Sequence, residues 1–300
     1  MTISAVKRHG VHQLDIVVRR IPFVLHEGID PVWNPGKREW SHMVNGASLT
    51  MPYLEPFLIK TMREALPHIN DDRLRAEAQG FVEQEAQHYQ NHRRYNDMLK
   101  SKGYDVLAQV EEGYREEYAA LSKRSLHWKL AYSAGFETMT IGMTEWLIRG
   151  RQKLFQNADP MVTSFVLWHM VEETEHKSVA IDVYRACFDD YLVRVAGLFW
   201  GSLHVALLAR RAYTAMLKAD GVWGNWRSRL RLYRMVASFF ANATPAMARA
   251  LVPGYHPQRV PDPAWAELWG DHYKRLKEGE IPLLNTSDSE IPPVFVARAA

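Results

Sequence analysis

The sequence predicts an all-α protein, because apolar residues recur at helical spacing along most of the chain and no strand-helix alternation indicates a parallel sheet. With 300 residues, 47% of them hydrophobic, the chain is long enough to bury a substantial core. Its 37 basic and 34 acidic residues nearly balance, so we expect no nucleic-acid partner. The single cysteine, Cys187, excludes an intramolecular disulfide framework.

Capping and helix-breaking residues set the expected helix boundaries. Asp159 followed by Pro160 is typical of a helix start, and Gly150 is typical of a helix end. Only a short segment separates the first two predicted helices, so we expect them to pair as an antiparallel hairpin. In chain order, the sequence predicts helices over residues 54–65, 72–100, 105–121, 125–149, 160–184, 190–219 and 226–251, and a short one over 264–278.

Both ends of the sequence are predicted to be irregular. Residues 11–40 mix short β-branched runs with glycines and prolines, and the chain after Pro253 is rich in proline. We therefore divide the chain into an N-terminal arm (1–45), a helical bundle with the site and extra helices (46–255) and a wrapping tail (256–300). The first residues contain no apolar stretch typical of a secretion signal, so we expect a cytoplasmic protein.

Two Glu-x-x-His units are candidate metal ligands: Glu85 with His88, and Glu173 with His176. Residues three apart share one face of a helix, so each unit can direct a carboxylate and an imidazole toward one point. One such unit alone is weak evidence, because glutamate and histidine are common enough to produce it by chance. The repetition of the unit is therefore the informative observation.

A lone glutamate precedes each unit on the preceding predicted helix: Glu55 lies 30 residues before Glu85, and Glu137 lies 36 residues before Glu173. Glu137 stands in an apolar stretch without a neighbouring cation, so burying it ionised would be costly unless a metal compensated its charge. A ferritin-like di-iron bundle uses one Glu from each of two helices and a Glu-x-x-His from each of the other two. We therefore predict a ferritin-like four-helix bundle with additional C-terminal helices and two metal ions bound by Glu55, Glu85, His88, Glu137, Glu173 and His176.

Other polar residues on the same helices are candidates for extra ligands or for hydrogen-bond partners of the ligands. These candidates are His92, His169, Glu172 and Asp182, together with Gln84. By contrast, we expect Glu83 and Glu175 to face solvent or a loop. The oxygen-rich ligand set favours iron, with manganese next, over zinc, which prefers four tetrahedral ligands.

Three stretches resemble a bacterial family labelled predicted metal-dependent hydrolases: residues 51–57, 81–94 and 169–184. The resemblance covers about residues 15 to 260 and implies an all-helical fold with a metal site on the six residues above. The acidic stretch 172–176 is also similar to the Glu-x-x-His signature of soluble acyl desaturases and ribonucleotide reductase small subunits. Pro56 departs from the pattern: it is expected to place Glu55 in the first turn of a helix, which makes Glu55 the least secure ligand.

Three functions follow from this site. We rank first an O2-dependent di-iron oxidase or oxygenase that acts on a hydrophobic small molecule and takes electrons from a donor protein. The alternative, which follows the resemblance, is a two-metal hydrolase. It ranks lower because an inward-facing carboxylate-histidine bundle encloses its metals, and because no Gly-x-Ser-x-Gly elbow indicates hydrolytic machinery. The third is a non-catalytic metal-binding protein.

Two further features concern partners. The apolar run between Arg194 and Arg210 is shorter than the ~20 residues that span a bilayer, so a buried helix is favoured over contact with a membrane surface. A basic cluster in the following helix is expected to be a solvated face, with an acidic protein or a phospholipid surface as alternatives; it consists of Arg227, Arg229, Arg231 and Arg234. A homodimer is compatible with the sequence.

Overall fold

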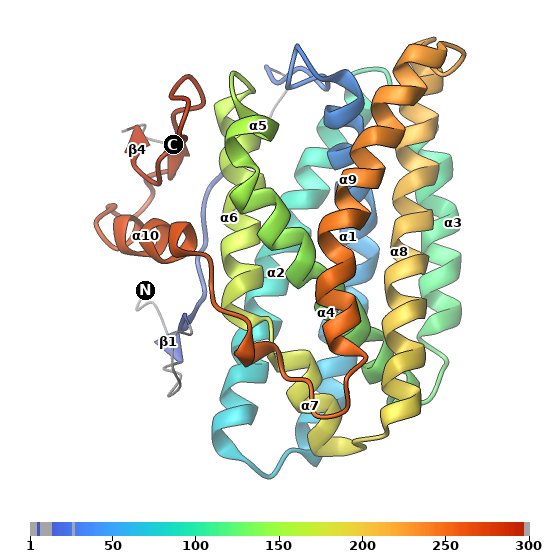
Figure 1. The fold of residues 1–300 in the computed structure, drawn as a ribbon, viewed down its shortest axis with the longest axis vertical. Helices are drawn as coiled ribbons and strands as arrows, with labels where there is room; N and C mark the ends of the chain where they lie inside the picture. The colour runs from blue at the N-terminus through green and yellow to red at the C-terminus, as the bar shows by residue number, and fades with distance from the viewer. Residues whose placement is uncertain (1–4, 7–13, 26–27, 297–300) are drawn as a thin grey trace.

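A computed structural model describes residues 5–6, 14–25 and 28–296 of the chain, and it confirms the all-α prediction (Figure 1). Short 3-10 turns follow the first helix (Leu66–His68) and precede the last (Pro257–Arg259). The α-helices are α1 (Arg38–Ala65), α2 (Asp72–Ser101), α3 (Val106–Leu121), α4 (Leu126–Arg149), α5 (Arg151–Phe155), α6 (Pro160–His176), α7 (Val179–Cys187), α8 (Tyr191–Ala219), α9 (Trp226–Ala250) and α10 (Ala264–Tyr273).

Side-chain caps begin several helices where the sequence predicts them. The Ser125 hydroxyl accepts a hydrogen bond from the backbone of α4, and the Asp159 carboxylate accepts two from the first turn of α6. The predicted helix over 160–184 is instead two helices, because α6 ends at His176 and α7 starts at Val179. The last helix is also shorter than predicted, ending at Tyr273.

The first helix starts much earlier than predicted, at Arg38 instead of residue 54. Pro52 and Pro56 therefore lie inside α1, where a proline removes a backbone donor. The carbonyl of Ser48, which the missing N–H of Pro52 leaves free, accepts a hydrogen bond from the Asn96 side chain of α2 at 3.0 Å. A partner on the neighbouring helix thus compensates for the proline, which sequence periodicity alone does not reveal.

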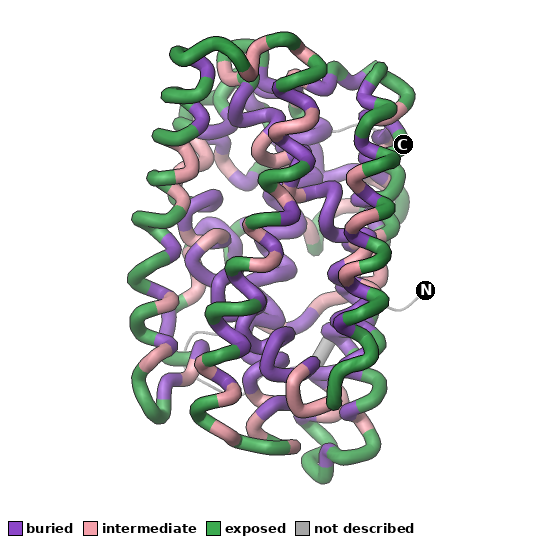
Figure 2. The backbone as a smooth tube through the Cα atoms, turned by 90° about the vertical axis from the view of Figure 1, so that its right-hand side faces the viewer, coloured by how far each residue is buried: buried purple, intermediate pink, exposed green. Residues whose placement is uncertain are grey.

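The long helices run roughly along one axis of the molecule, with α1, α2, α4 and α6 around a common interior (Figure 1). Helices α8 and α9 form an outer layer that packs mainly on α4 and α1. Buried residues line the inside of this arrangement and exposed residues its outside (Figure 2). The two ends of the chain form small antiparallel pairs, β1 (Ala5–Val6) with β2 (Ile16–Val17) and β3 (Leu283–Leu284) with β4 (Phe295–Val296).

Glycines allow α4 and α8 to approach at backbone distance. A Cβ atom added to Gly135 of α4 would lie 2.2 Å from the carbonyl oxygen of Gly197 in α8. A Cβ on Gly142 of α4 would lie 2.7 Å from the Cα of Ala243 in α9. Because these contacts involve backbone atoms, a side chain at either position cannot be accommodated by a change of rotamer.

We predict that Gly135→Ala lowers the free energy of unfolding by about 3 kcal/mol, because the added methyl group forces α4 and α8 apart. The matched control is Gly113→Ala in α3, where an added Cβ meets nothing within 4 Å. There the better helix propensity of alanine should stabilise the protein by about 0.5–1 kcal/mol. Urea denaturation measures both changes, and two values of the same sign would contradict this account of the helix contact.

Candidate metal centre

The six predicted ligands converge in the interior from four helices. They are Glu55 on α1, Glu85 and His88 on α2, Glu137 on α4, and Glu173 and His176 on α6; none is more than 5% exposed. On α2 and α6 the three-residue spacing places each carboxylate and its histidine on the same inward face. Glu55 lies well inside α1, so the expectation that Pro56 places it in a first turn is wrong.

The distances define four overlapping groups of ligand atoms among the described residues, and two of these groups consist only of the six predicted ligands. Atoms of Glu55, Glu85 and His88 lie within 4.8 Å of one another, as do atoms of Glu85, Glu137 and His176. Glu85 belongs to both of these groups. Glu173 lies close to both as well, because its carboxylate is 3.4 Å from Nε2 of His176 and 3.9 Å from Nδ1 of His88. The other two groups add His169, once with His88 and Glu173 and once with Glu55 and His92.

The cluster contains polar atoms that have no hydrogen-bond partner among the described residues. Both carboxylate oxygens of Glu55 and Glu85 are unpaired and buried, and Glu137 and Glu173 each have one such oxygen. The same holds for Nδ1 of His88 and Nε2 of His176. Each predicted ligand thus presents at least one unsatisfied atom. Buried polar atoms left unpaired cost free energy, so the donor set fits a metal centre.

The pKa values of the side chains in the cluster also fit a site that binds positive charge. Burial, reinforced by neighbouring carboxylates, raises the pKa of Glu55, Glu85 and Glu137 well above the usual range of a glutamate. Burial and the adjacent His169 lower the pKa of His88 well below its usual value. Bound metal ions would favour the ionised form of these carboxylates, and the neutral imidazole that the lowered pKa of His88 favours is the form that binds metal.

Glu173 differs from the other three carboxylates because histidines surround it. Burial alone would raise the pKa of Glu173, but the favourable interactions with His176 and His169 hold it well below its usual range. Glu173 is thus the one of the four carboxylates whose ionised form the protein itself favours.

The residue before each motif glutamate holds the histidine of the other motif. Glu172, which precedes Glu173 on α6, lies 3.0 Å from Nε2 of His88 on α2. Gln84, which precedes Glu85 on α2, offers its Oε1 to Nδ1 of His176 on α6 at 2.9 Å. Each histidine therefore has one nitrogen fixed by an outer partner and the other nitrogen aimed at the cluster, as in metal-bound histidines.

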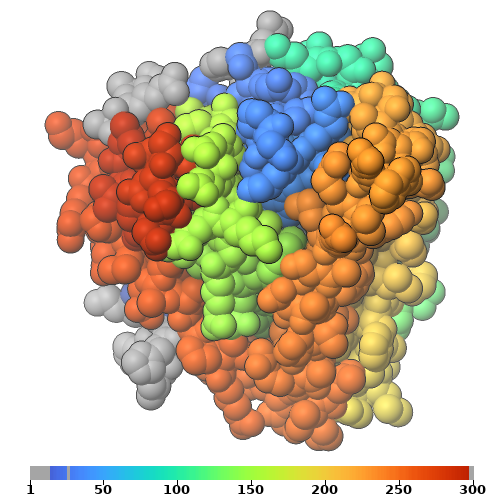
Figure 3. Space-filling view, turned by 45° about the horizontal axis from the view of Figure 1, so that its top comes forward, coloured from blue at the N-terminus to red at the C-terminus, as the bar shows by residue number. Residues whose placement is uncertain are grey.

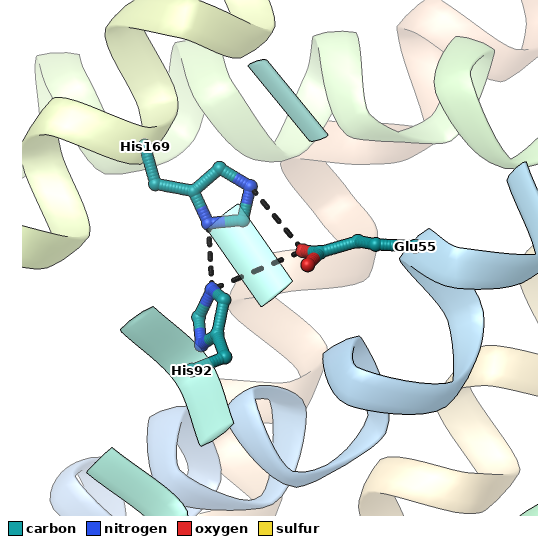
Figure 4. Close-up of side chains that lie close together, drawn as sticks. All are labelled: Glu55, His92 and His169. Atoms are coloured by element: carbon teal, nitrogen blue, oxygen red, sulfur yellow. Dashed lines mark hydrogen bonds and ion pairs between the residues drawn. The ribbon is translucent and has the colours of Figure 1, made fainter. Parts of the chain in front are cut away.

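His92 and His169, the two further histidine candidates, lie beside the cluster near Glu55 (Figure 4). Nε2 of His169 is 2.9 Å from Glu173 and 3.8 Å from Glu55, and its Nδ1 is 2.9 Å from Nε2 of His92. Nδ1 of His92 reaches the hydroxyl of Ser48 at 2.8 Å. A chain of close polar contacts thus runs from Glu173 through both histidines outward to α1.

Asp182, the remaining candidate, is not part of this arrangement. It lies on α7 and pairs with Nε2 of His256 at 2.6 Å, and it belongs to none of the groups that could hold an ion among the described residues. Nine residues separate Asp182 from Glu173, so even a continuous helix would place the two side chains on opposite faces, and the helix also breaks between His176 and Val179.

The profile of a protein family described as "predicted metal-dependent hydrolase" matches residues 17–260. The chain belongs to this family. No curated protein and no solved structure matches the chain significantly. The family match contains all six ligand candidates and the outer partners of both histidines, so the site lies wholly within the part that this chain shares with its family.

Sequence reasoning missed a buried cation beside the site. Arg19 is 3% exposed and its guanidinium binds Glu175 at 2.5 Å and Glu172 at 3.0 Å. Glu175 is therefore buried, and the expectation that it faces solvent or a loop is wrong; Glu83 is exposed as expected. Burial raises the pKa of Glu172 to about 7, against the opposing effect of Arg19. Three glutamates lie close together on this buried helix: Glu172, Glu173 and Glu175. Such a group indicates that a cation lies nearby, but it does not indicate which residue supplies the cation.

The N-terminal arm and the C-terminal helix hold this cation in place. The backbone N–H of Val17 donates to Glu175, and the Gln84 amide donates to the Val17 carbonyl and to Glu175. The guanidinium of Arg19 lies 5.3 Å from the ring centre of Trp269 and 5.2 Å from that of Tyr273, both on α10. Helix α10 lies outside residues 17–260, the part of the chain that matches the family.

We predict that Arg19→Met lowers the free energy of unfolding by about 3 kcal/mol, because it leaves Glu172 and Glu175 buried without their cation. The double variant Arg19→Met with Glu175→Gln removes one of the two uncompensated charges and should recover part of this loss. Chemical denaturation of the wild type, the single variants and the double variant measures the coupling. Additive losses would show that the pair does not interact as described.

Proposed function

We propose that this protein is a two-metal hydrolase whose ions are held by Glu55, Glu85, His88, Glu137, Glu173 and His176. The observation that supports it most is that every one of these six buried side chains presents an unpaired ligand atom to a common interior. The description of the family supports hydrolysis as the reaction. When bound, two divalent ions would lower the pKa of a water molecule and polarise the carbonyl or phosphoryl oxygen under attack.

The residues of the chain prepare the site for this chemistry. Glu172 and Gln84 fix the orientation of His88 and His176, and the surrounding helices exclude bulk water. Low solvent access strengthens every electrostatic interaction inside the site. Both histidine rings are thus oriented before any ion binds, because Glu172 and Gln84 each hold the ring nitrogen that faces away from the cluster.

We further propose that His169 contributes a seventh ligand atom, and hydrogen-bond directions support this. The Ser48 hydroxyl donates to Asn96, so it accepts from Nδ1 of His92. Nε2 of His92 then accepts from Nδ1 of His169. With its proton on Nδ1, a neutral His169 has a lone pair on Nε2, which points toward Glu173 and Glu55. A metal ion suits that lone pair better than a carboxylate oxygen does.

A second candidate function, O2-dependent oxidation of a hydrophobic small molecule by two iron ions, is favoured by the enclosure of the site. The cavity that reaches Glu173 measures about 10 Å³, and Ile141, Thr144 and Val260 are among its lining residues. That volume holds about one water molecule. A reactant as small as O2 can enter such a cavity, whereas a hydrolytic substrate requires the segment around Val260 to move. Iron would supply the electrons for this reaction, and a donor protein would restore them.

We predict that the purified protein binds about two divalent ions per chain and that Glu85→Gln reduces this to less than one, because Glu85 belongs to both groups of ligands. The matched control is Glu83→Gln, an exposed residue two positions earlier on the same helix, which should bind as the wild type does. Elemental analysis after dialysis measures the ions. Full metal content in Glu85→Gln would refute the proposed centre.

The two reactions differ in their need for oxygen. For the hydrolase we expect cleavage of activated ester or phosphate substrates by the zinc-, manganese- or iron-loaded protein at equal rates under nitrogen and under air. For the oxidase we expect no cleavage, and instead an absorbance in the near ultraviolet that appears only when O2 is added to the Fe(II)-loaded protein. Stoichiometric metal with neither response would leave a non-catalytic metal-binding protein.

A further inference from the structure

The outer layer of α8 and α9 differs from the rest of the molecule in charge. Residues 191–252 contain nine basic residues and one acidic residue, Asp220, although the whole chain has a net charge of only +3. Asp220 is itself bound to His42 and Tyr104. The basic residues are Arg194, Arg210, Arg211, Lys218, Arg227, Arg229, Arg231, Arg234 and Arg249. The rest of the chain is therefore net acidic, and the positive charge is concentrated on one layer.

Most of these cations are exposed and available. Among the described residues, Arg211 pairs with Glu117 and Arg231 with Glu39, whereas Arg194 is buried. The remaining six are exposed and form no ion pair with any described residue: Arg210, Lys218, Arg227, Arg229, Arg234 and Arg249. The basic cluster that the sequence indicated in α9 is therefore mostly unpaired.

The same layer also exposes large apolar side chains. On α8, Leu192 is 75% exposed, and Phe199 and Leu203 are each 54% exposed. Their spacing of seven and four residues places them along one side of the helix, opposite the side that packs on α4. On α9, Trp226 is 63% exposed and Tyr233 is 52% exposed. Apolar and basic groups are thus both exposed on this outer layer. Figure 3 shows the two helices at the surface, with α9 (orange) next to α1 (blue) and α8 in yellow.

Helix α8 is also long and apolar enough to cross a membrane by length and composition alone. Its position argues against crossing, because it packs at backbone distance on α4 through Gly197 and Gly201. The buried Arg194 donates to the carbonyl of Ala250 on α9, which ties the two helices together. An apolar helix fixed in this way can lie on a membrane surface without entering it as a span.

We propose that the exposed layer of α8 and α9 docks on an anionic phospholipid surface. Anionic lipid head groups supply negatively charged partners for the arginines that have none among the described residues. The interfacial region of the bilayer accepts apolar side chains such as Phe199, Leu203 and Trp226. A second copy of this chain fits less well, because two such faces would bring like charges together. An acidic protein would satisfy the arginines but leaves the aliphatic stripe on α8 unexplained.

Vesicle co-sedimentation of the full-length, metal-loaded protein tests the proposal. We expect binding to vesicles that contain phosphatidylglycerol, little binding to pure phosphatidylcholine, and weaker binding as salt concentration rises.

Arg227→Glu with Arg234→Glu should weaken binding about tenfold or more, because it reverses two charges at the surface. Phe199→Ser with Leu203→Ser should weaken it without removing its salt dependence. The matched control, Lys60→Glu with Lys123→Glu, reverses two exposed, unpaired charges on other elements and should bind as the wild type does.

Three results would overturn the proposal. The first is a wild-type protein that does not bind anionic vesicles, and the second is an equal loss of binding in the control variant. The third is a dimer in size-exclusion chromatography that dissociates in Phe199→Ser with Leu203→Ser, which would assign the face to a second copy of the chain. Circular dichroism of each variant checks that it is folded. Neither hydrolysis nor oxidation enters these measurements, so they test the surface independently of the reaction at the metal centre.

Discussion

The structure depends on the compensation of buried negative charge. Six glutamates lie in or directly around the centre: Glu55, Glu85, Glu137, Glu172, Glu173 and Glu175. An isolated carboxylate in such surroundings either binds a proton or pairs with a cation, since its desolvation is too costly otherwise. Among the described residues, Arg19 is the cation that pairs with the two outer glutamates. The four inner glutamates lie against each other, the histidines and Thr140, without a lysine or arginine partner among the described residues, so bound metal ions would stabilise their ionised forms.

The interactions around these glutamates form two layers. The inner layer leaves ligand atoms unpaired, whereas in the outer layer Glu172 and Gln84 each hold a histidine and are themselves paired with Arg19 or Glu175. Gln84 illustrates the outer layer, because its carbonyl holds His176 and its amide donates to Glu175. Through Glu175 the same network reaches Arg19, and through Arg19 it reaches the aromatic rings of α10. The ends of the chain therefore help to fix ring orientations inside the bundle, although they contribute no ligand themselves.

The sequence alone predicts the inner layer better than the outer one. A ligand pattern such as Glu85 with His88 depends on local helix geometry, so its spacing can be recognised without knowing the fold. Arg19 lies 153 residues from Glu172, and nothing local in the sequence indicates that contact. The start of α1 was misjudged for a similar reason, because the compensation of Pro52 comes from Asn96 on another helix. Asp182 failed as a candidate because its nine-residue separation from Glu173 places it on the opposite face of a helix, and because the helix breaks after His176.

Helix α4 connects the proposed centre to the outer layer. One face of α4 supplies Glu137 to the ion positions, and its glycines contact α8 and α9 at backbone distance. Gly135 lies two residues before Glu137, so the closest contact with α8 and the ligand are within one turn of each other. Backbone contacts of this kind leave little room for independent movement, because no side chain between the helices can change its rotamer. A force on α8 at a lipid surface would therefore act directly on the helix that carries Glu137, which gives a physical reason for the centre and the basic layer to occur in the same bundle.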